Sequence, residues 1–314
     1  MSWYWICLLI VLIILIMDII ASNYFISVAL TRNKKIKHYK KELFKISKKA
    51  KEKKAQNKLE VVEWLNHSNP EEVKINSYGF KLDALYFNNN SHKWVILIHG
   101  YTGKKEEMLH LARWYYENGF SILVPDLRSH GSSEGKYYGM GYLDRLDILN
   151  WIKYITNNDK KAKIILHGHS MGAATTLFTA GENPNNLVGC ISDCSYTSVY
   201  SVFKLQVKKI YKLPGHILIG FSNFLFRLKK DGYSMKKGNV LEFTKKIKVP
   251  VLFIHGTKDD LLPYTMCDEL YEACQSKKEK VLFEGCGHAQ SELEDSELFF
   301  DTIGKFIKKN IDFK

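Results

Sequence analysis

Lys163-Ile-Ile-Leu-His-Gly-His-Ser-Met-Gly-Ala173 is the stretch of this 314-residue chain that decides its fold. Residues 164–166 form a short apolar run typical of a buried parallel strand, and the small residues 173–180 predict a helix. Between them, residues 168–172 form a Gly-x-Ser-x-Gly motif. We therefore predict a sharp strand-to-helix turn with Ser170 at its apex.

This turn makes Ser170 a candidate nucleophile. A serine held there has a strained backbone, and side chains at positions 168 and 172 would collide with the neighbouring strand and helix. Free N–H groups at the start of the helix favour an anion that develops beside the hydroxyl.

Charge is unevenly distributed along the chain, whose net charge is +13. Residues 32–54 hold twelve basic and two acidic residues, and the remainder is nearly balanced. This pattern does not indicate a nucleic-acid partner.

The six cysteines are Cys7, Cys190, Cys194, Cys267, Cys274 and Cys286. They form no Cys-x-x-Cys pair and have no zinc-ligand spacing. We therefore predict reduced core thiols, no metal and no cofactor.

Residues 1–30 are predicted to be a single transmembrane anchor. Trp3 to about Ile26 is almost wholly apolar, with Asp18 as the only charge. Such a helix is about 36 Å long and crosses a hydrocarbon core of about 30 Å. A cleaved signal peptide fits less well, because no basic region precedes the apolar run.

Residues 31–57 are predicted to be a basic juxtamembrane helix or linker. An apolar stripe recurs at helical spacing, at Ile36, Tyr39, Leu43, Ile46 and Ala50. The pattern is typical of a helix on anionic lipid headgroups (residues 32–54), although a solvated linker helix would carry similar charges. The positive-inside rule then places the remaining domain in the cytoplasm.

Residues 58–314 are predicted to form one α/β domain. Two alternating runs joined at Tyr78-Gly79 indicate an antiparallel hairpin at the edge of the sheet. Strands and helices then alternate, which predicts a mostly parallel sheet of about eight strands with helices on both faces. The expected strands are 94–98, 121–124, 164–166, 187–191, 251–254 and 280–283, and the expected helices are 106–117, 143–156, 266–275 and 296–309. Residues 195–249 are too long for a plain connection and predict a small helical cap over the carboxyl edge of the sheet.

A serine nucleophile needs a histidine base that a carboxylate orients. His288 follows the last strand on a glycine-rich loop, and we favour it over His130 and His255. Asp259 follows the preceding strand and completes the chain order Ser, Asp, His; Asp260 and Asp193 are the alternatives.

The oxyanion requires two backbone donors. We expect one to be the N–H of Met171, directly after the nucleophile. The other should be the N–H of Tyr101, in the loop after the strand at 94–98.

These motifs resemble those of the α/β-hydrolase superfamily. They are His99-Gly100, residues 126–133, Gly168–Gly172, His255–Asp259 and Gly287-His288, and they occur in the order typical of that superfamily. Residues 139–147, with the N-terminal anchor, are similar to bacterial membrane-associated hydrolases related to the serine aminopeptidase and prolyl-oligopeptidase groups. The resemblance implies acyl transfer through Ser170, Asp259 and His288. One departure is Ser129, where such proteins usually have glycine, and many relatives place the domain outside the membrane.

The predicted activity is therefore hydrolysis of a carboxylic ester or thioester of a small molecule or acyl chain. A peptidase or amidase that uses the same triad is the first alternative, and a membrane-tethered scaffold without activity is the second. An acyl chain or an acidic ester would suit the basic and apolar residues of the cap, which are Phe203, Lys204, Lys208, Lys209, Phe221, Phe224 and Phe226.

Overall fold

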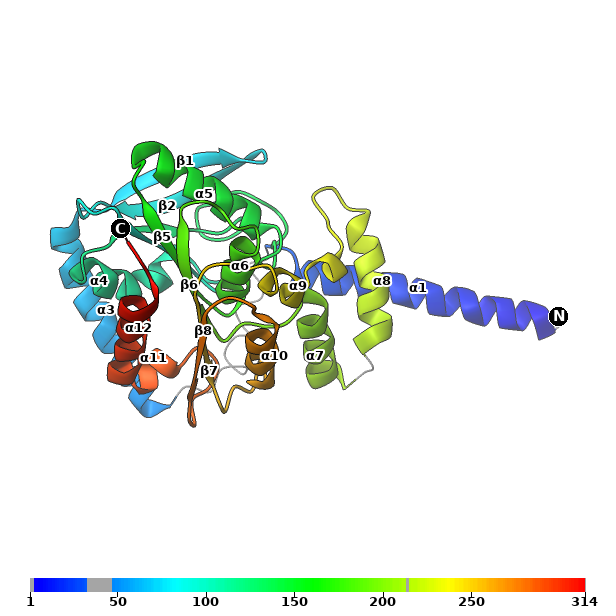
Figure 1. The fold of residues 1–314 in the computed structure, drawn as a ribbon. Helices are drawn as coiled ribbons and strands as arrows, with labels where there is room; N and C mark the ends of the chain where they lie inside the picture. The colour runs from blue at the N-terminus through cyan, green and yellow to red at the C-terminus, as the bar shows by residue number, and fades with distance from the viewer. Residues whose placement is uncertain (1–2, 33–46, 213–214, 314) are drawn as a thin grey trace.

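An eight-stranded sheet forms the centre of the computed structural model, which describes residues 3–32, 47–212 and 215–313 (Figure 1). The strand order is β1-β2-β4-β3-β5-β6-β7-β8. Neighbours from β4 to β8 are parallel, and only the β1–β2 and β2–β4 pairs are antiparallel. The strands are β1 (Glu71–Ser77), β2 (Phe80–Phe87), β3 (Lys93–Ile98), β4 (Ser121–Pro125), β5 (Lys163–His169), β6 (Leu187–Asp193), β7 (Val251–Gly256) and β8 (Lys278–Phe283). This confirms the predicted α/β-hydrolase sheet and its edge hairpin.

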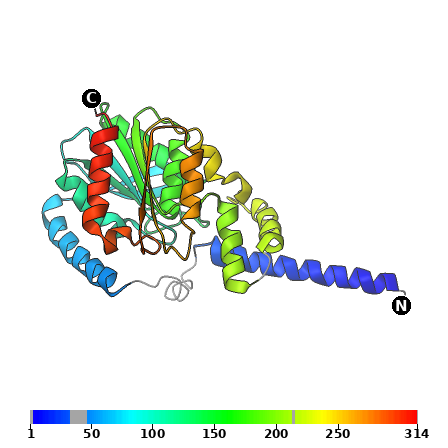
Figure 2. The ribbon, with the colours of Figure 1, turned by 60° about the horizontal axis from the view of Figure 1, so that its bottom comes forward.

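Helices cover both faces of the sheet (Figures 1 and 2). Side chains alternate along β3: Ile96 enters the core under α5 and α6, and Val95 enters the core under α4 and α12. The helices are α1 (Trp3–Ala29), α3 (Lys48–Ser68), η2 (Lys105–Met108), α4 (Leu109–Glu117), α5 (Asp144–Asn158), α6 (Met171–Ala180), α7 (Val199–Tyr211), α8 (Gly215–Arg227), η3 (Met235–Lys237), α9 (Val240–Thr244), α10 (Thr265–Ala273), α11 (Ser291–Glu294) and α12 (Ser296–Asn310).

Helix α3 joins the basic segment to the α/β domain. The expected boundary between residues 57 and 58 falls inside this helix, which continues through it without a break. The Asn57 side chain donates a hydrogen bond to Glu292 Oε1 at 2.9 Å, and Trp64 stacks on Phe87 with ring centroids 4.8 Å apart. The domain therefore includes residues that the charge pattern assigned to the linker. The rest of the expected basic stripe, Ile36 to Ile46, lies outside the described residues.

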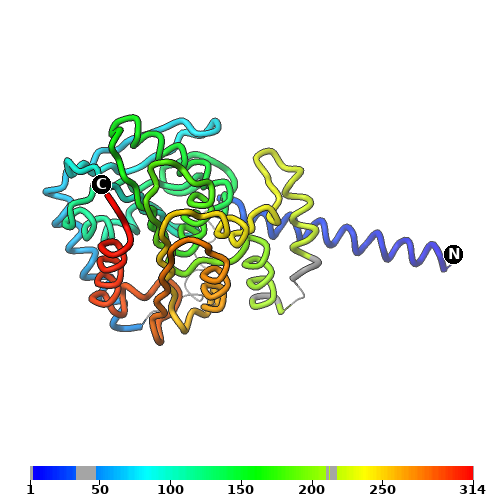
Figure 3. The backbone as a smooth tube through the Cα atoms, in the orientation of Figure 1, coloured from blue at the N-terminus to red at the C-terminus, as the bar shows by residue number. Residues whose placement is uncertain are grey.

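Helix α1 projects away from the domain and is long and apolar enough to cross a membrane (Figure 3). Its last turns contact the domain, where Phe25 and Ile26 are buried. The Phe25 ring meets Phe203 of α7 edge to face, with centroids 5.3 Å apart. The long connection between β6 and β7 supplies α7, α8, η3 and α9, and α8 contacts α1.

Candidate active site

Ser170 occupies the turn between β5 and α6 in a backbone conformation with φ 56° and ψ −121°. A Cβ placed on Gly168 would lie 2.3 Å from Gly172 O, and one on Gly172 would lie 2.0 Å from Ile98 O. The tight contact of strand and helix thus requires both glycines, for the physical reason that the sequence indicates. Ser170 itself is only partly buried.

His288 lies between Ser170 and Asp259. Its Nε2 is 2.8 Å from Ser170 Oγ, and its Nδ1 is 2.6 Å from Asp259 Oδ2. With a proton on Nδ1, the imidazole donates to the carboxylate and leaves Nε2 to accept the serine hydroxyl proton. The structure therefore brings the three residues together that the sequence singles out.

The Asp259 carboxylate is held in its charged form. Burial alone would raise its pKa, but hydrogen bonds from His255 and His288 outweigh burial and hold the pKa below its usual range. Its Oδ1 also accepts the backbone N–H groups of Leu261 and Leu262, each at 2.8 Å. An anionic Asp259 is the form that stabilises a protonated histidine.

The two alternative aspartates have different surroundings. Asp260 is exposed, and its backbone carbonyl accepts a hydrogen bond from Lys209. Asp193 is buried at the end of β6, and burial raises the pKa of its carboxyl to about 7, with nearby Asp259 contributing. Among the described residues, its Oδ1 has no hydrogen-bond partner. Neither carboxylate takes the place of Asp259 beside His288.

The two alternative histidines support loops. His255 Nε2 lies 2.9 Å from Leu262 O and 3.1 Å from Asp259 Oδ2, the same carboxylate oxygen that His288 contacts. His130 Nε2 accepts the N–H of Thr102 at 3.2 Å, and its Nδ1 lies 2.8 Å from Arg128 O. The sequence analysis did not predict the contact of His255 with Asp259, although its position four residues before Asp259 was an available signal.

The loop after β3 lies directly against the nucleophile. A Cβ on Gly100 would be 3.4 Å from Ser170 Cβ and 3.1 Å from His169 Nε2. The loop that carries the Tyr101 N–H is therefore packed closely against His169 and Ser170. Met171 is the first residue of α6. Both expected backbone donors therefore belong to segments adjoining Ser170.

The Tyr101 side chain contacts the end of α1 and Tyr138. Its hydroxyl donates a hydrogen bond to Ala29 O at 2.9 Å, and its ring lies against Tyr138 with centroids 5.1 Å apart. Ala29 is the last residue of α1. The end of α1 and the loop beside Ser170 are thus directly connected, a contact that nothing in the sequence motifs indicates.

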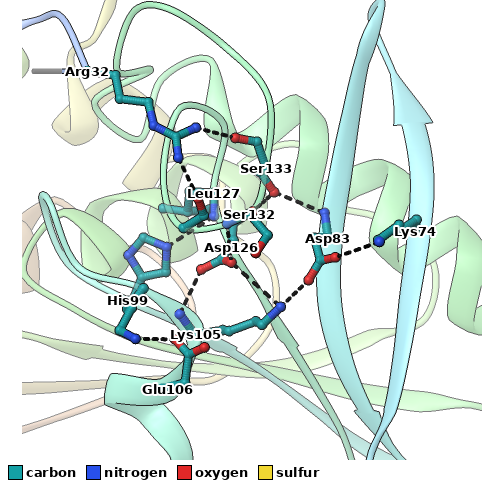
Figure 4. A network of polar contacts seen from close by, with 12 residues as sticks. Arg32, Lys74, Asp83, His99, Lys105, Glu106, Asp126, Leu127, Ser132 and Ser133 are labelled. Carbon is teal, nitrogen blue, oxygen red and sulfur yellow. Dashed lines mark hydrogen bonds and ion pairs between the residues drawn. The ribbon is translucent and has the colours of Figure 1, made fainter.

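A second polar network contacts the segment that follows the loop after β3 (Figure 4). Asp126 accepts the N–H groups of Lys105 and Ser132, each at 2.8 Å, and the Lys105 ammonium pairs with Asp83. The Arg32 guanidinium donates to Ser133 O at 2.7 Å. We call these residues, Arg32, Asp83, Lys105, Asp126, Ser132 and Ser133, the Asp126 network. It ties the segment after α1 to the loops that follow β3 and β4.

Ser129, the departure from the glycine typical of the superfamily, has a φ of 64°. This is the left-handed region that glycine adopts most readily, so the departure carries backbone strain. The Ser129 hydroxyl donates to Tyr137 O at 2.8 Å, and this bond helps to hold the turn.

One group of three described residues could hold a metal ion: Cys194, Asp259 and His288 offer ligand atoms within 4.8 Å of one another. Two of them are the partners of Ser170. Burial raises the pKa of the Cys194 thiol well above its usual value, and nearby Asp193 adds to this shift. The thiolate that a metal requires is therefore disfavoured, and the three residues fit a metal poorly.

Comparisons with known proteins agree with this geometry. A sequence model of the family described as "Serine aminopeptidase, S33" matches residues 89–226. The crystal structure of the esterase Pf2001 of Pyrococcus furiosus superposes with a TM-score of 0.64 and 26% identity, covering 77% of this chain and 93% of the esterase. Fold, motif order and these likenesses show that the chain belongs to the α/β-hydrolase superfamily.

Two curated relatives are similar over most of their length. YqkD of Bacillus subtilis (strain 168), which is uncharacterised, is 27% identical over 234 residues, 74% of this chain and 76% of its own. The uncharacterised membrane protein YNL320W of Saccharomyces cerevisiae is 23% identical over 239 residues, 75% of each chain. The match to the serine aminopeptidase model and the likeness to the Pf2001 esterase support a hydrolase of the esterase- and peptidase-like kind.

Proposed function

We propose that this protein is a membrane-anchored serine hydrolase that cleaves a carboxylic ester or thioester. The observation that carries the proposal is the continuous chain of contacts from Ser170 Oγ through His288 to Asp259, at 2.8 and 2.6 Å. Three residues far apart in the sequence meet in the geometry that activates a serine hydroxyl.

In the proposed reaction, Ser170 Oγ attacks the acyl carbon while His288 Nε2 accepts its proton. The N–H groups of Tyr101 and Met171 stabilise the oxyanion. His288 then protonates the leaving alcohol or thiol, and an acyl-serine remains. Water, deprotonated by His288, attacks the acyl-serine, and the carboxylic acid leaves with Ser170 restored.

Labelling by a fluorophosphonate tests the activated serine. We expect the full-length protein in detergent to be labelled, and labelling to be lost in Ser170→Ala and His288→Ala. Ser132→Ala and His67→Ala are matched controls, because both residues are exposed and lie outside the triad. A folded wild-type protein that resists labelling would favour the scaffold without activity.

A peptidase or amidase on the same triad is the second candidate function, favoured by the match to the serine aminopeptidase family. A panel of aminoacyl amides beside acyl esters of increasing chain length separates the two. Amides turned over as fast as esters would assign the site to a peptidase.

We further propose that α1 spans the membrane with the hydrolase domain in the cytoplasm. Basic residues 32–54 follow α1 directly, as the positive-inside rule requires. In a Cys7→Ser background, because Cys7 is exposed and the other cysteines are buried, Lys308→Cys introduces an exposed cysteine on α12 for labelling by an impermeant maleimide. Labelling of intact cells would place the domain outside instead.

A further inference from the structure

Helix α8 carries apolar side chains on two opposite faces. Ile219 and Phe226 are fully buried on the face toward the domain. On the opposite face Phe224 is 52% exposed, and Leu228, one residue beyond the end of α8, is 69% exposed. Large apolar side chains opposite the buried face of a helix are normally covered, either by protein or by lipid.

The exposed part of α1 ends where the domain begins. Residues 3–21 are exposed, apart from the half-buried Asp18, and Ser22 is the first fully buried residue. At 1.5 Å per residue, this exposed part is about 28 Å long, close to the thickness of a hydrocarbon core of about 30 Å. The domain therefore starts at the level where α1 would leave the bilayer.

Helix α8 lies at this same level. It crosses α1 (Figures 1 and 2), and Lys229, just beyond the end of α8, donates a hydrogen bond from Nζ to Asn23 Oδ1 at 3.1 Å. A helix that crosses a membrane span at its end lies along the membrane surface. Phe224 and Leu228 then extend the apolar surface of α1 sideways at the boundary.

The charges around α8 fit anionic headgroups. Residues 199–230 contain seven basic residues and no acidic residue. The exposed ones are Lys204, Lys208, Lys209, Lys212, Arg227 and Lys230. Long basic side chains at a membrane boundary reach toward headgroup phosphates and add about 1 kcal/mol each. The net charge of the chain thus comes from two segments, and not from residues 32–54 alone.

We propose that α8 is an interfacial helix, that Phe224 and the adjoining Leu228 enter the membrane that α1 crosses, and that the site takes its acyl substrate from that membrane. The occupant of the exposed face is lipid, because this face continues the apolar surface of α1 and its segment, residues 199–231, carries seven basic residues against one acidic residue, Asp231. The inference rests on the proposed anchor and hydrolase activity.

The contact between α1 and the loop that adjoins Ser170 supports a lipid substrate. The Tyr101 hydroxyl contacts Ala29, which is seven residues beyond Ser22 and therefore about 10 Å along α1 from the boundary.

Two of the aromatic residues that the sequence suggested for an acyl site, Phe203 and Phe226, have other contacts. Phe203 meets Phe25, and Phe226 meets Tyr137 and Tyr233. They attach the inserted helices to α1 and to neighbouring loops.

Membrane contact is tested with an environment-sensitive fluorophore on single cysteines. The full-length protein, in a Cys7→Ser background because the other cysteines are buried, carries Phe224→Cys or Leu228→Cys. Leu59→Cys is the matched control, since Leu59 is 72% exposed but lies on α3. In phosphatidylglycerol–phosphatidylcholine vesicles that contain a spin-labelled lipid, we expect quenching at 224 and 228 at least about threefold stronger than at 59.

Equal quenching at the three positions would overturn the membrane contact. So would a fluorescence change at 224 and 228 that depends on protein concentration in detergent, because it would assign the face to a second copy of the chain. This readout needs no enzymatic activity, so its failure is distinct from failure of the proposed hydrolase.

Substrate origin is tested with Phe224→Ser/Leu228→Ser and its matched control Leu59→Ser/Val62→Ser, both pairs being exposed. We expect the first variant to lose about tenfold in kcat/KM toward a long-chain ester in vesicles. Hydrolysis of a soluble short-chain ester should remain within about twofold of the wild type. Equal losses on both substrates, or no loss on either, would contradict a membrane-derived substrate.

Discussion

Two polar networks meet at the loop after β3, and they differ in how they end. In the proposed triad, the contacts run in one line and stop at the partly buried hydroxyl of Ser170. In the Asp126 network (Figure 4), the contacts branch and return to backbone groups, with Lys105 between Asp83 and Asp126. Burial and charge are common to both, so neither property distinguishes a reactive site from a structural one.

The two networks differ in what their charges stabilise. The Lys105 pKa is affected first by burial, which lowers it, but hydrogen bonding to Asp83 and the charge of Asp126 raise it overall. Charges that satisfy one another contribute to loop position and stability. A line of contacts that ends at an accessible hydroxyl is free to change its protonation when a substrate binds. We therefore expect the first network to affect catalysis and the second to affect folding.

The largest expected effect comes from removing the charge beside His288. Asp259→Asn should lower kcat by about 10⁴-fold, because the amide favours the wrong histidine tautomer. Steady-state ester hydrolysis measures the effect, and Asp260→Asn is the control, since Asp260 is exposed. A larger loss in Asp193→Asn than in Asp259→Asn would assign the acid to Asp193.

The Asp126 network should respond in stability instead. Lys105→Met leaves the buried Asp126 without its cation and Asp83 with Lys74 alone, and should lower the free energy of unfolding by about 3–5 kcal/mol. Lys104→Met is the matched control, because the exposed Lys104–Glu106 pair contributes about 0–1 kcal/mol. Denaturant unfolding in detergent compares them. Equal effects would show that the Asp126 network stabilises no more than a surface pair.

The unfolding free energy should depend on pH in opposite ways through Asp193, at the end of β6, and Asp259, in the loop after β7. The pKa of Asp193 is raised to about 7, so between about pH 4 and pH 7 the folded state binds a proton that the unfolded state has lost. Its contribution to stability therefore falls as pH rises through this window. The lowered pKa of Asp259 acts in the opposite direction, and its contribution is lost only in acid, as pH falls.

The unfolding free energy should decrease between pH 4 and pH 8. We expect Asp193→Asn to reduce this decrease by about 1–3 kcal/mol. Part of the decline should remain, because burial also raises the pKa of Asp144 to about 7. Chemical denaturation across this range measures it, with Asp260→Asn as control. An unchanged slope would show that Asp193 stays ionised in the folded protein.

The smallest expected effect concerns the contact between the loop and α1. Tyr101→Phe removes the hydrogen bond to Ala29 O and should lower kcat about two- to tenfold without raising KM, because the backbone donor is held less firmly. Tyr264→Phe, at a more exposed tyrosine, is the control. A change in KM alone would mean that the hydroxyl affects substrate binding and not the position of the loop.

Most of the fold could be predicted because local patterns report it directly. The apolar run of β5, the hairpin at Tyr78-Gly79 and the alternation of strands with helices all reflect the periodicity of side-chain burial. The expected boundary at residues 57 and 58 lies inside α3, whose many lysines obscure the few residues that contact the domain. Asn57 and Ala50 are buried by α3 docking on distant segments, which composition does not reveal.

The candidate site was predictable for a related reason. Ser170, Asp259 and His288 each follow a strand, and parallel strands end at one edge of the sheet. The choice between Asp259 and Asp193 was less direct, because both satisfy this condition. The two N–H groups at Leu261 and Leu262 distinguish them, and these depend on how the loop after β7 folds.

The succession of strands and helices along the chain, the turn at Ser170 and the apolar character of α1 follow from local sequence, since each depends on residues close together in the chain. Folding of the whole chain is what brings the buried charges of the Asp126 network together and places Ala29 against Tyr101, 72 residues away. It also decides which face of α8 stays exposed beside α1. Such contacts depend on the packing of segments distant in sequence, and no local periodicity encodes that packing.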